Sequence, residues 1–294
     1  MAFHSGFAAI IGRPNVGKST LLNRFTGLKV SIVSAKPQTT RTRVMGVMNR
    51  PDTQIVFVDT PGIHEPRTRL GEFMDQSVNE ALNDIDALLY VVDASHITDK
   101  DYALAETYSS MRCPKFLLLN KIDTVSPETL LKAIDRFRTL SYDDFFPISA
   151  QNGEGVAALE EALIRAMPEG PMYYPEDMPT DQPEQFICAE LIREKALRHL
   201  RDEVPHGIGV EILRFEKQGN LRVIDATMYC EKASHKSIII GKGGQTLREI
   251  GREARLDIEK LIGEHVHLEI WVKVRPGWRD SAEDLKTLGY TMKN

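Results

Sequence analysis

The sequence predicts an α/β domain built around a mostly parallel sheet, followed by a smaller α+β domain. In the first half, short apolar runs alternate with helical patterns, which is typical of a sheet covered by helices. Five prolines then fall between residues 168 and 183, a density that excludes a helix or a central strand. We therefore expect domains at residues 1–167 and 186–294, joined by an extended linker at residues 168–185.

The expected strands of the first domain are almost wholly apolar, as in sheets that helices cover on both faces. They span residues 7–11, 44–48, 54–59, 87–93, 115–120 and 145–149. Ligands bind such sheets beyond the carboxyl ends of the strands. Four residues end or follow strands at that edge: Gly12, Asp59, Asn120 and Ser149.

The second half has the order helix, strand, strand, helix, helix, strand. An amphipathic helix over 186–200 turns its apolar residues toward one face, and residues 209–215 and 221–229 read as a hairpin with its turn at 218–220. Helices follow at 234–240 and 245–262. In the last strand, 266–274, apolar residues alternate with polar ones.

Charge is distributed unevenly along the 294 residues, which carry a net charge of −5. Residues 186–294 hold 19 Lys and Arg against 17 Asp and Glu, and the remainder holds 18 against 25. A basic patch for nucleic acid therefore belongs in the C-terminal part.

Three widely spaced cysteines without a C-x-x-C pair favour a reducing, cytoplasmic compartment and argue against a structural zinc site. The longest apolar runs fall short of a membrane span, and the first residues do not read as a secretory signal. Membrane contact, if any, would be peripheral, on the inner face of the cell membrane. We expect a monomer.

A glycine-bearing loop between the first strand and the next helix predicts phosphate binding. Glycines let successive N–H groups point at the β- and γ-phosphates, aided by the positive helix N-terminus. Lys18 adds a charge, and the Ser19 hydroxyl is a ligand for Mg²⁺. The predicted set is Gly12, Arg13, Pro14, Asn15, Val16, Gly17, Lys18, Ser19 and Thr20.

The run Asp59, Thr60, Pro61 and Gly62 predicts a sensor for Mg²⁺ and the γ-phosphate. Asp59 would reach the metal, usually through water, and the Gly62 N–H would bind the γ-phosphate. Residues 36–41 form a polar loop between the two motifs, in which Thr40, rather than Thr39, would ligate Mg²⁺ only while the γ-phosphate is bound. A plain surface loop is the alternative.

The run 120–123 predicts that the base is guanine. The Asp123 carboxylate would accept from N1–H and the N2 amine of guanine, donors that adenine does not offer, and an unpaired buried carboxylate would penalise ATP. The Lys121 stem would lie over the ring, and Asn120 would tie the base loop to the phosphate loop. Ser149 and Ala150 would support the loop and give a backbone N–H to guanine O6.

The sequence identifies no catalytic residue for hydrolysis. Many switch GTPases place a glutamine after the D-x-x-G glycine to orient water, but Ile63 stands there and cannot do so. The neighbouring His64 is a weak candidate, because an isolated loop histidine is more often simply exposed. We therefore expect slow intrinsic turnover that a partner or a cation accelerates.

These motifs resemble those of the bacterial Era GTPases. The phosphate loop, the Gln-Thr-Thr-Arg run at 38–41 and the motif at 59–62 look like the P-loop GTPase half of that family, and the C-terminal half resembles its type II KH domain. The resemblance covers essentially the whole chain. The family lacks the water-orienting glutamine, so Ile63 fits it. Similarity to potassium-stimulated relatives implies that Asn15 is a candidate ligand for K⁺ beside the phosphates.

The G-x-x-G run at 241–244 predicts single-stranded RNA binding. Its glycines let the backbone approach a nucleic-acid backbone, Lys242 offers a phosphate contact, and the flanking window is net positive. The predicted contacts are Lys236, Gly241, Lys242, Gly243, Gly244 and Arg248. The alternative is an ordinary helix–helix turn with a solvated basic face.

Four further residues near the C-terminus have structural interpretations that need no ligand. Trp271 and Trp278 would stack on bases or, the interpretation we favour, pack against the long helix. His265 and His267 lack a third ligand, so we do not predict a metal there.

The resemblance implies a GTP-hydrolysing switch that binds the 3′ end of the 16S ribosomal RNA and acts in assembly of the small ribosomal subunit. The residues alone do not name that RNA. The alternative is a signalling GTPase with a protein or membrane-surface effector, and a metabolic kinase fits poorly because residues 120–123 select guanine.

Overall fold

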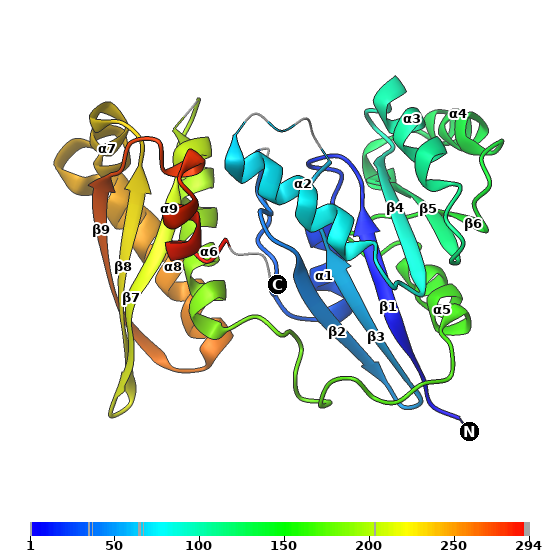
Figure 1. Cartoon of the computed structure of the whole chain (residues 1–294), viewed down its shortest axis with the longest axis horizontal. Coiled ribbons are helices and arrows are strands. Elements are labelled where there is room, and N and C mark those ends of the chain that lie inside the picture. The colour runs from blue at the N-terminus through cyan, green and yellow to red at the C-terminus, as the bar shows by residue number, and fades with distance from the viewer. Residues whose placement is uncertain are drawn as a thin grey trace. The chain divides into compact units, whose positions relative to one another are not determined.

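The computed structural model describes residues 2–34, 36, 38–63, 66, 68–202 and 204–290 (Figure 1). The chain divides into two compact units. The first contains Met1–Ser31, Thr42–Glu65 and Asp75–Asp181, and the second contains Ile32–Arg41, Pro66–Met74 and Gln182–Asn294. Two segments from the first half of the chain therefore belong to the C-terminal unit. The division into domains at residues 1–167 and 186–294 with a linker at 168–185 stays a prediction.

The first unit is built on a six-stranded sheet in the order β2-β3-β1-β4-β5-β6. Only the β2–β3 pair is antiparallel, so the sheet is mostly parallel as predicted. The strands are β1 (His4–Ile11), β2 (Val44–Arg50), β3 (Thr53–Asp59), β4 (Ala87–Asp93), β5 (Lys115–Asn120) and β6 (Asp144–Pro147).

Helices cover both faces of this sheet, which explains the apolar runs. On β1, Ala8 and Ile10 pack into one cluster with α1 and α5, while Ala9 and Ile11 pack into a second cluster with α3 and α4. The helices are α1 (Lys18–Thr26), α2 (Arg69–Ala81), α3 (Asp99–Tyr108), α4 (Pro127–Phe137) and α5 (Val156–Ala166). Strand ends at one edge carry the predicted nucleotide motifs.

The proline-rich segment belongs to the first unit up to Asp181 and packs on it. Gln54 Oε1 accepts hydrogen bonds from the backbone N–H groups of Tyr173 (2.8 Å) and Tyr174 (3.0 Å), and its Nε2 donates to Tyr174 O at 2.7 Å. The Tyr173 ring lies against Phe7 with centroids 4.9 Å apart. The segment is therefore extended but fixed in place.

The second unit has a three-stranded sheet in the order β7-β8-β9, with helices packed on one face. The pair β7–β8 is an antiparallel hairpin, and β8–β9 is parallel. Its elements are α6 (Glu184–His199), β7 (Gly209–Gln218), β8 (Leu221–Cys230), α7 (Ala233–Ile240), α8 (Gln245–Ile262), β9 (His265–Val274) and α9 (Ala282–Thr287). The predicted order of elements is confirmed.

Helix α6 is buried more completely than its amphipathic pattern predicted. Besides its apolar residues, it buries Arg193, Glu194 and Lys195, which are 0%, 0% and 3% exposed. The segment 32–41 belongs to the same unit: Glu194 accepts from the Val33 N–H at 3.3 Å, and Ile32 packs in the apolar cluster of α6. A single polar face on α6 was therefore wrong, because chain distant in sequence covers it.

Among the described residues, no helix is long and apolar enough to cross a membrane.

Candidate nucleotide and nucleic-acid sites

The phosphate loop is closely enclosed by the protein. Gly12 has φ +147°, and a Cβ there would lie 2.3 Å from Val91 O. Gly17 has φ +102°, and a Cβ there would lie 2.1 Å from Asn120 Nδ2. Both positions need glycine for backbone angle and for space, so the loop has one shape.

Lys18, the first residue of α1, points its ammonium back into this loop. Nζ donates to Gly12 O at 3.0 Å and to Arg13 O at 2.9 Å, and the residue is 6% exposed. Burial lowers the pKa of Lys18 to about 8, against the opposing attraction of Asp59. A phosphate at this loop would restore the charged form.

Asp59, at the end of β3, is fully buried beside Ser19. Its Oδ2 accepts from Ser19 Oγ at 2.7 Å and from Ser31 Oγ at 3.0 Å. Its Oδ1 is buried without a hydrogen-bond partner among the described residues, and burial raises the pKa of the carboxyl. An orphaned carboxylate oxygen next to a hydroxyl suits a hard cation, so these residues fit Mg²⁺.

The sensor motif contacts the phosphate loop directly. The Ile63 N–H donates to Gly12 O at 3.1 Å, and a Cβ on Gly62 would lie 2.6 Å from the Pro14 backbone. The Ile63 side chain packs at the edge of the apolar cluster that contains α3 and α4. His64, the other candidate beside it, lies outside the described residues.

Asn120 connects the phosphate loop to the base loop, as predicted. Its Nδ2 donates to Val16 O at 2.7 Å, and its Oδ1 accepts from the Ala150 N–H at 2.9 Å. The Ala150 N–H, which we assigned to guanine O6, therefore already has a protein acceptor. Ser149 is fully buried, and its Oγ accepts from the Asn152 N–H at 3.2 Å.

Asp123 and Lys121 flank the predicted base position. Lys121 has φ +66° and its Nζ pairs with Asp93 Oδ2 at 2.5 Å, a partner the sequence did not indicate. Asp123, in the short 3₁₀ helix Ile122–Thr124, is exposed. The Asp123 carboxylate is thus open to solvent, whereas the sequence predicted a buried one in the nucleotide complex.

Thr39 and Thr40 belong to the C-terminal unit, whereas Ser19 and Asp59 belong to the first. Thr40 is 8% exposed there. Arg193 of α6 donates from Nη1 to Gln38 O at 3.4 Å and from Nη2 to Thr39 O. The switch threonines therefore belong to a different compact unit from the other predicted Mg²⁺ ligands, and their assignment to Mg²⁺ stays a prediction.

Arg41 anchors the end of this segment in the same unit, and sequence reasoning missed it. It is 1% exposed and donates to Ile208 O (2.6 Å), His206 O (3.1 Å) and the Tyr290 hydroxyl (3.2 Å). Its guanidinium carbon lies 5.5 Å from the Trp278 ring centroid. The only sequence signal was a polar loop ending in arginine.

The glycine turn between α7 and α8 has an open geometry. Gly243 and Gly244 have φ of +59° and +77°, and a Cβ on either would meet nothing within 4 Å among the described residues. Gly241 is tighter, because a Cβ there would lie 2.2 Å from Thr246 Oγ1. Lys242 is exposed at the tip. The turn can be approached closely from solvent.

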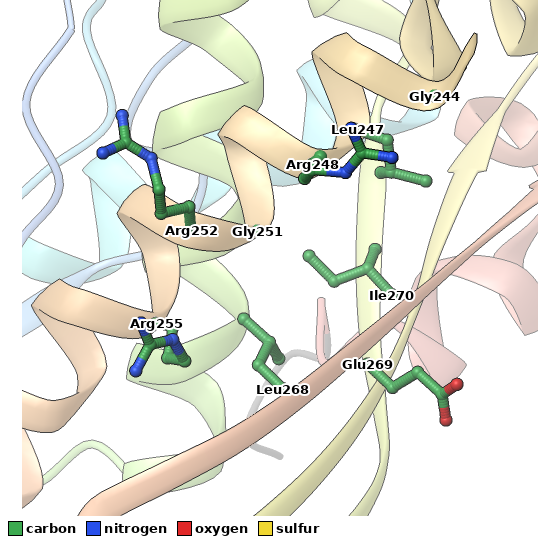
Figure 2. Close-up of a pocket in the computed structure, with 9 residues that line it drawn as sticks. All are labelled: Gly244, Leu247, Arg248, Gly251, Arg252, Arg255, Leu268, Glu269 and Ile270. Carbon is green, nitrogen blue, oxygen red and sulfur yellow. The ribbon is translucent and has the colours of Figure 1, made fainter.

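A groove of about 480 Å³ runs from this turn between α8 and β9 (Figure 2). Figure 2 shows Leu268 and Ile270 of β9 between the strand and the helix, with Arg248, Arg252 and Arg255 projecting from α8. The remaining lining residues are Gly244, Leu247, Gly251 and Glu269. The groove thus has a basic side on α8 and an apolar side on β9, where Glu269 is the one acidic residue among the described residues that line it.

The cations around the groove differ in their partners. Arg252 pairs with Glu249 at 2.9 Å and Arg255 with Glu259 at 3.0 Å, both on α8 itself. Arg248 is exposed, and the described residues provide no ion pair for it or for Lys236 and Lys242. These three side chains are therefore the ones with charge to spare for phosphate.

Packing of both tryptophans on the long helix was wrong. Trp271 is 58% exposed and lies on the face of β9 opposite the residues that contact α8. Trp278 is fully buried, but among Tyr229, Leu285 and Tyr290 rather than on α8. The cluster around Trp278 also contains Leu70 and Met74 of α2 and Leu288. The apolar period of one segment could not predict it, because its members are far apart in the sequence. Among the described residues, neither His265 nor His267 belongs to a cluster of three or more His, Cys, Asp or Glu side chains that could hold a metal ion.

Comparisons with known proteins agree with this geometry in both halves. Residues 7–121 match the model of a family described as 50S ribosome-binding GTPase, and residues 203–279 match the KH domain family. The chain is 48% identical to GTPase Era of Ruminiclostridium cellulolyticum, with all of both chains covered. It is 49% identical to GTPase Era of Caldicellulosiruptor saccharolyticus, covering 100% and 99% of the two chains.

The chain belongs to the Era family of GTPases. Among solved structures, a variant of Aquifex aeolicus Era bound to GDP and AlF4⁻ superposes with a TM-score of 0.94 at 39% identity, covering 99% of this chain and 100% of that one. Era in complex with MgGDPNP and nucleotides 1506–1542 of 16S ribosomal RNA gives the same TM-score and coverage at 40% identity. This Era-family member is a GTPase with a C-terminal KH domain.

Proposed function

We propose that this Era GTPase binds the 3′ end of the 16S ribosomal RNA in the groove between α8 and β9, and that it acts in assembly of the small ribosomal subunit. The observation that carries the proposal is the open glycine turn at the head of a basic groove, on the same chain as a guanine nucleotide site. A relative of 40% identity binds such an RNA segment.

The groove chemistry suits a single strand. Leu268 and Ile270 offer an apolar surface to unstacked bases, and Arg248 and Lys242 offer charges to phosphates. Gly243 is exposed and Gly244 is half-buried, and the open space at both lets the sugar–phosphate backbone approach without a side chain in between. Bases would therefore face β9 and phosphates would face the turn.

In the nucleotide site, each proposed residue has a defined task. The backbone of residues 12–17 and the Lys18 ammonium hold the phosphates, while Asn120 and Asp123 fix the base. Ser19 and Asp59 would hold Mg²⁺, which neutralises charge on the β- and γ-phosphates when bound. Ile63 supplies no polar group, so we propose slow turnover, with K⁺ at Asn15 as the stimulating charge.

Segment 32–41 is proposed to report the nucleotide state to the C-terminal unit. Within the C-terminal unit, Arg193 binds the carbonyl groups of Gln38 and Thr39, and Arg41 anchors the end of the segment, so a nucleotide-dependent change at the buried Thr40 would alter these contacts. We expect Arg41→Met to reduce the difference in RNA affinity between the states loaded with GDPNP and GDP. Equal RNA affinities in both states of the wild type would contradict this coupling.

Binding of a labelled RNA with the sequence of 16S nucleotides 1506–1542 tests the proposed partner. A shuffled RNA of equal length and composition is the control, and each is titrated with GDPNP and with GDP. We expect tighter binding of the ribosomal sequence by at least about tenfold. Equal affinities for both RNAs would overturn it and favour the protein or membrane-surface effector considered from the sequence.

A second experiment tests the base assignment. Asp123→Asn replaces an acceptor by an amide, and we expect preference to move from guanine toward xanthine nucleotides. Titration with GDP and XDP gives the ratio of the two affinities. An unchanged affinity for GDP would count against Asp123.

Turnover measured in K⁺ and in Na⁺ at equal ionic strength tests the proposal that Asn15 binds K⁺. Equal rates in the two salts would exclude it.

A further inference from the structure

We infer that Arg24 is a positioning residue for guanine recognition, because it fixes the backbone of the loop at residues 149–153. The inference rests on the proposed guanine site, in which this loop (residues 149–153, here called the clamp) gives a backbone N–H to guanine O6. Arg24 lies in the last turn of α1, the helix that begins with Lys18 and Ser19. One helix thus connects the phosphate end of the site to its base end.

The Arg24 guanidinium binds two consecutive carbonyl groups of the clamp. Its Nε donates to Ala150 O at 2.6 Å, and its Nη2 donates to Gln151 O at 2.6 Å. Two donors from one rigid planar group fix the direction of both carbonyls, which a single flexible ammonium would not do. The side chain is exposed, so these bonds do little for the core.

Fixing a carbonyl also fixes the amide of the next residue. In a trans peptide the C=O and N–H bonds point in opposite directions, and the described chain contains no cis peptide bond. The Gln151 N–H therefore points away from Arg24. The neighbouring amides are already used, since Ala150 N–H donates to Asn120 Oδ1 and Asn152 N–H to Ser149 Oγ.

The Gln151 amide is thus the clamp donor whose direction Arg24 sets. The described residues provide no acceptor for it, which leaves it available to guanine O6. Gly153 completes the fit: its φ is +96°, and a Cβ there would lie 2.7 Å from Arg24 Nη1, so the guanidinium lies directly on the glycine. A side chain at position 153 would therefore displace the Arg24 guanidinium from the loop.

The test compares nucleotides that change one edge of the base at a time. Affinities for GDP, 6-thio-GDP and IDP are measured by calorimetry for the wild type, Arg24→Met, Arg24→Lys and the control Arg165→Met, an exposed arginine of α5. Sulfur is a poor acceptor at position 6, and inosine lacks the N2 amine that Asp123 would read.

We expect Arg24→Met to weaken GDP binding by about tenfold and to bring GDP and 6-thio-GDP within about twofold of each other. The penalty for IDP should stay as in the wild type, because the Asp123 edge is untouched. Arg24→Lys should fall between, and Arg165→Met should match the wild type. A merely structural role would instead weaken all three nucleotides by one factor.

Equal weakening of the three nucleotides, or no change in any of them, would overturn the role of Arg24. If the wild type itself fails to discriminate against both IDP and 6-thio-GDP, the base assignment fails first, and the inference falls with it. The two failures are therefore distinguishable within one set of titrations.

Discussion

The two glycine-bearing turns that we assign to phosphate differ in what surrounds them. At Gly12 and Gly17, a Cβ would lie 2.3 Å and 2.1 Å from protein atoms. At Gly243 and Gly244, no atom of the described residues would lie within 4 Å of an added Cβ. The first turn needs glycine for space and angle, and the second needs it for angle and for the approach of a ligand.

This difference teaches that similar glycine patterns can serve opposite designs. The enclosed turn is suited to one ligand of fixed shape, a nucleotide phosphate held on all sides. The open turn is suited to a long strand that passes by. A side chain added at the first turn should therefore collide with protein atoms and distort the turn. A side chain added at the second turn should leave the protein intact and obstruct the bound RNA.

The largest effect is expected for Gly17→Ala. The new methyl group would collide with Asn120 Nδ2, whose bond to Val16 O holds the loop, and φ of +102° is strained for alanine. We expect nucleotide affinity to fall by more than about 100-fold and stability to fall by about 1–3 kcal/mol. Titration with a fluorescent GDP and thermal unfolding measure both.

Gly27→Ala is the matched control, because Gly27 has φ +69° at the end of α1 with nothing within 4 Å of a Cβ among the described residues. It should lose about 1 kcal/mol of stability and keep its affinity for nucleotide. Similar behaviour of the two variants would show that enclosure at Gly17 is unimportant.

Gly243→Asp should act through the ligand alone. A carboxylate at the open turn faces the RNA phosphates, so we expect RNA affinity to fall by about tenfold or more while GTPase activity stays unchanged. Gly219→Asp, in the β7–β8 hairpin with φ +62° and equally open space among the described residues, controls for backbone strain. Loss of RNA binding in both variants would point to strain, and loss of GTPase activity in Gly243→Asp would show that the units are not separable.

The enclosed turn should also show a pH dependence that the open one lacks. Lys18 has a pKa of about 8 through burial, and phosphate binds its charged form. Affinity for GDP should therefore be nearly full at pH 7.0 and fall by about fourfold between pH 7.0 and 8.5. Calorimetry in two buffers should find proton uptake on binding at pH 8.5, and binding without uptake would exclude this role.

The smallest effect should separate two arginines of the open groove. Arg248 has no ion pair among the described residues, whereas Arg252 pairs with Glu249 at 2.9 Å. Arg248→Met should lower the slope of log affinity for RNA against log salt by about 0.7, and Arg252→Met should lower it less. Filter binding from about 50 to 200 mM salt measures both slopes, because RNA binding releases counterions from the phosphates. The reverse order would mean that the Arg252 pair opens on binding.

Local patterns predicted most of the fold. Strands such as β4 and β5 and the helix α8 begin and end where their apolar periods do, because covering helices and glycine caps act within a few residues. Strand β6 ends at Pro147, two residues early, since Ile148 and Ser149 already bond to neighbouring chain as part of the base loop.

Contacts between distant segments could not be predicted in this way. No local rule places Arg41 against Trp278, or buries Arg193 and Glu194 of α6 under residues 32–41. The same holds for the Lys121–Asp93 pair and for Arg24 on the clamp. The motif residues of the site could be predicted from the sequence because nucleotide chemistry fixes their spacing. The residues that hold them in place could not, because tertiary packing decides which residues these are.

The two tryptophans of the chain give it a built-in optical reporter. Both lie in the C-terminal unit, Trp271 at 58% exposure on the sheet and Trp278 fully buried beside Arg41, while the first 270 residues contain none. A nucleotide added to unlabelled protein can thus alter indole emission only through a change around the tryptophans of the C-terminal unit. Quenching by iodide would distinguish the two indoles, because a soluble anion reaches one of them and not the other.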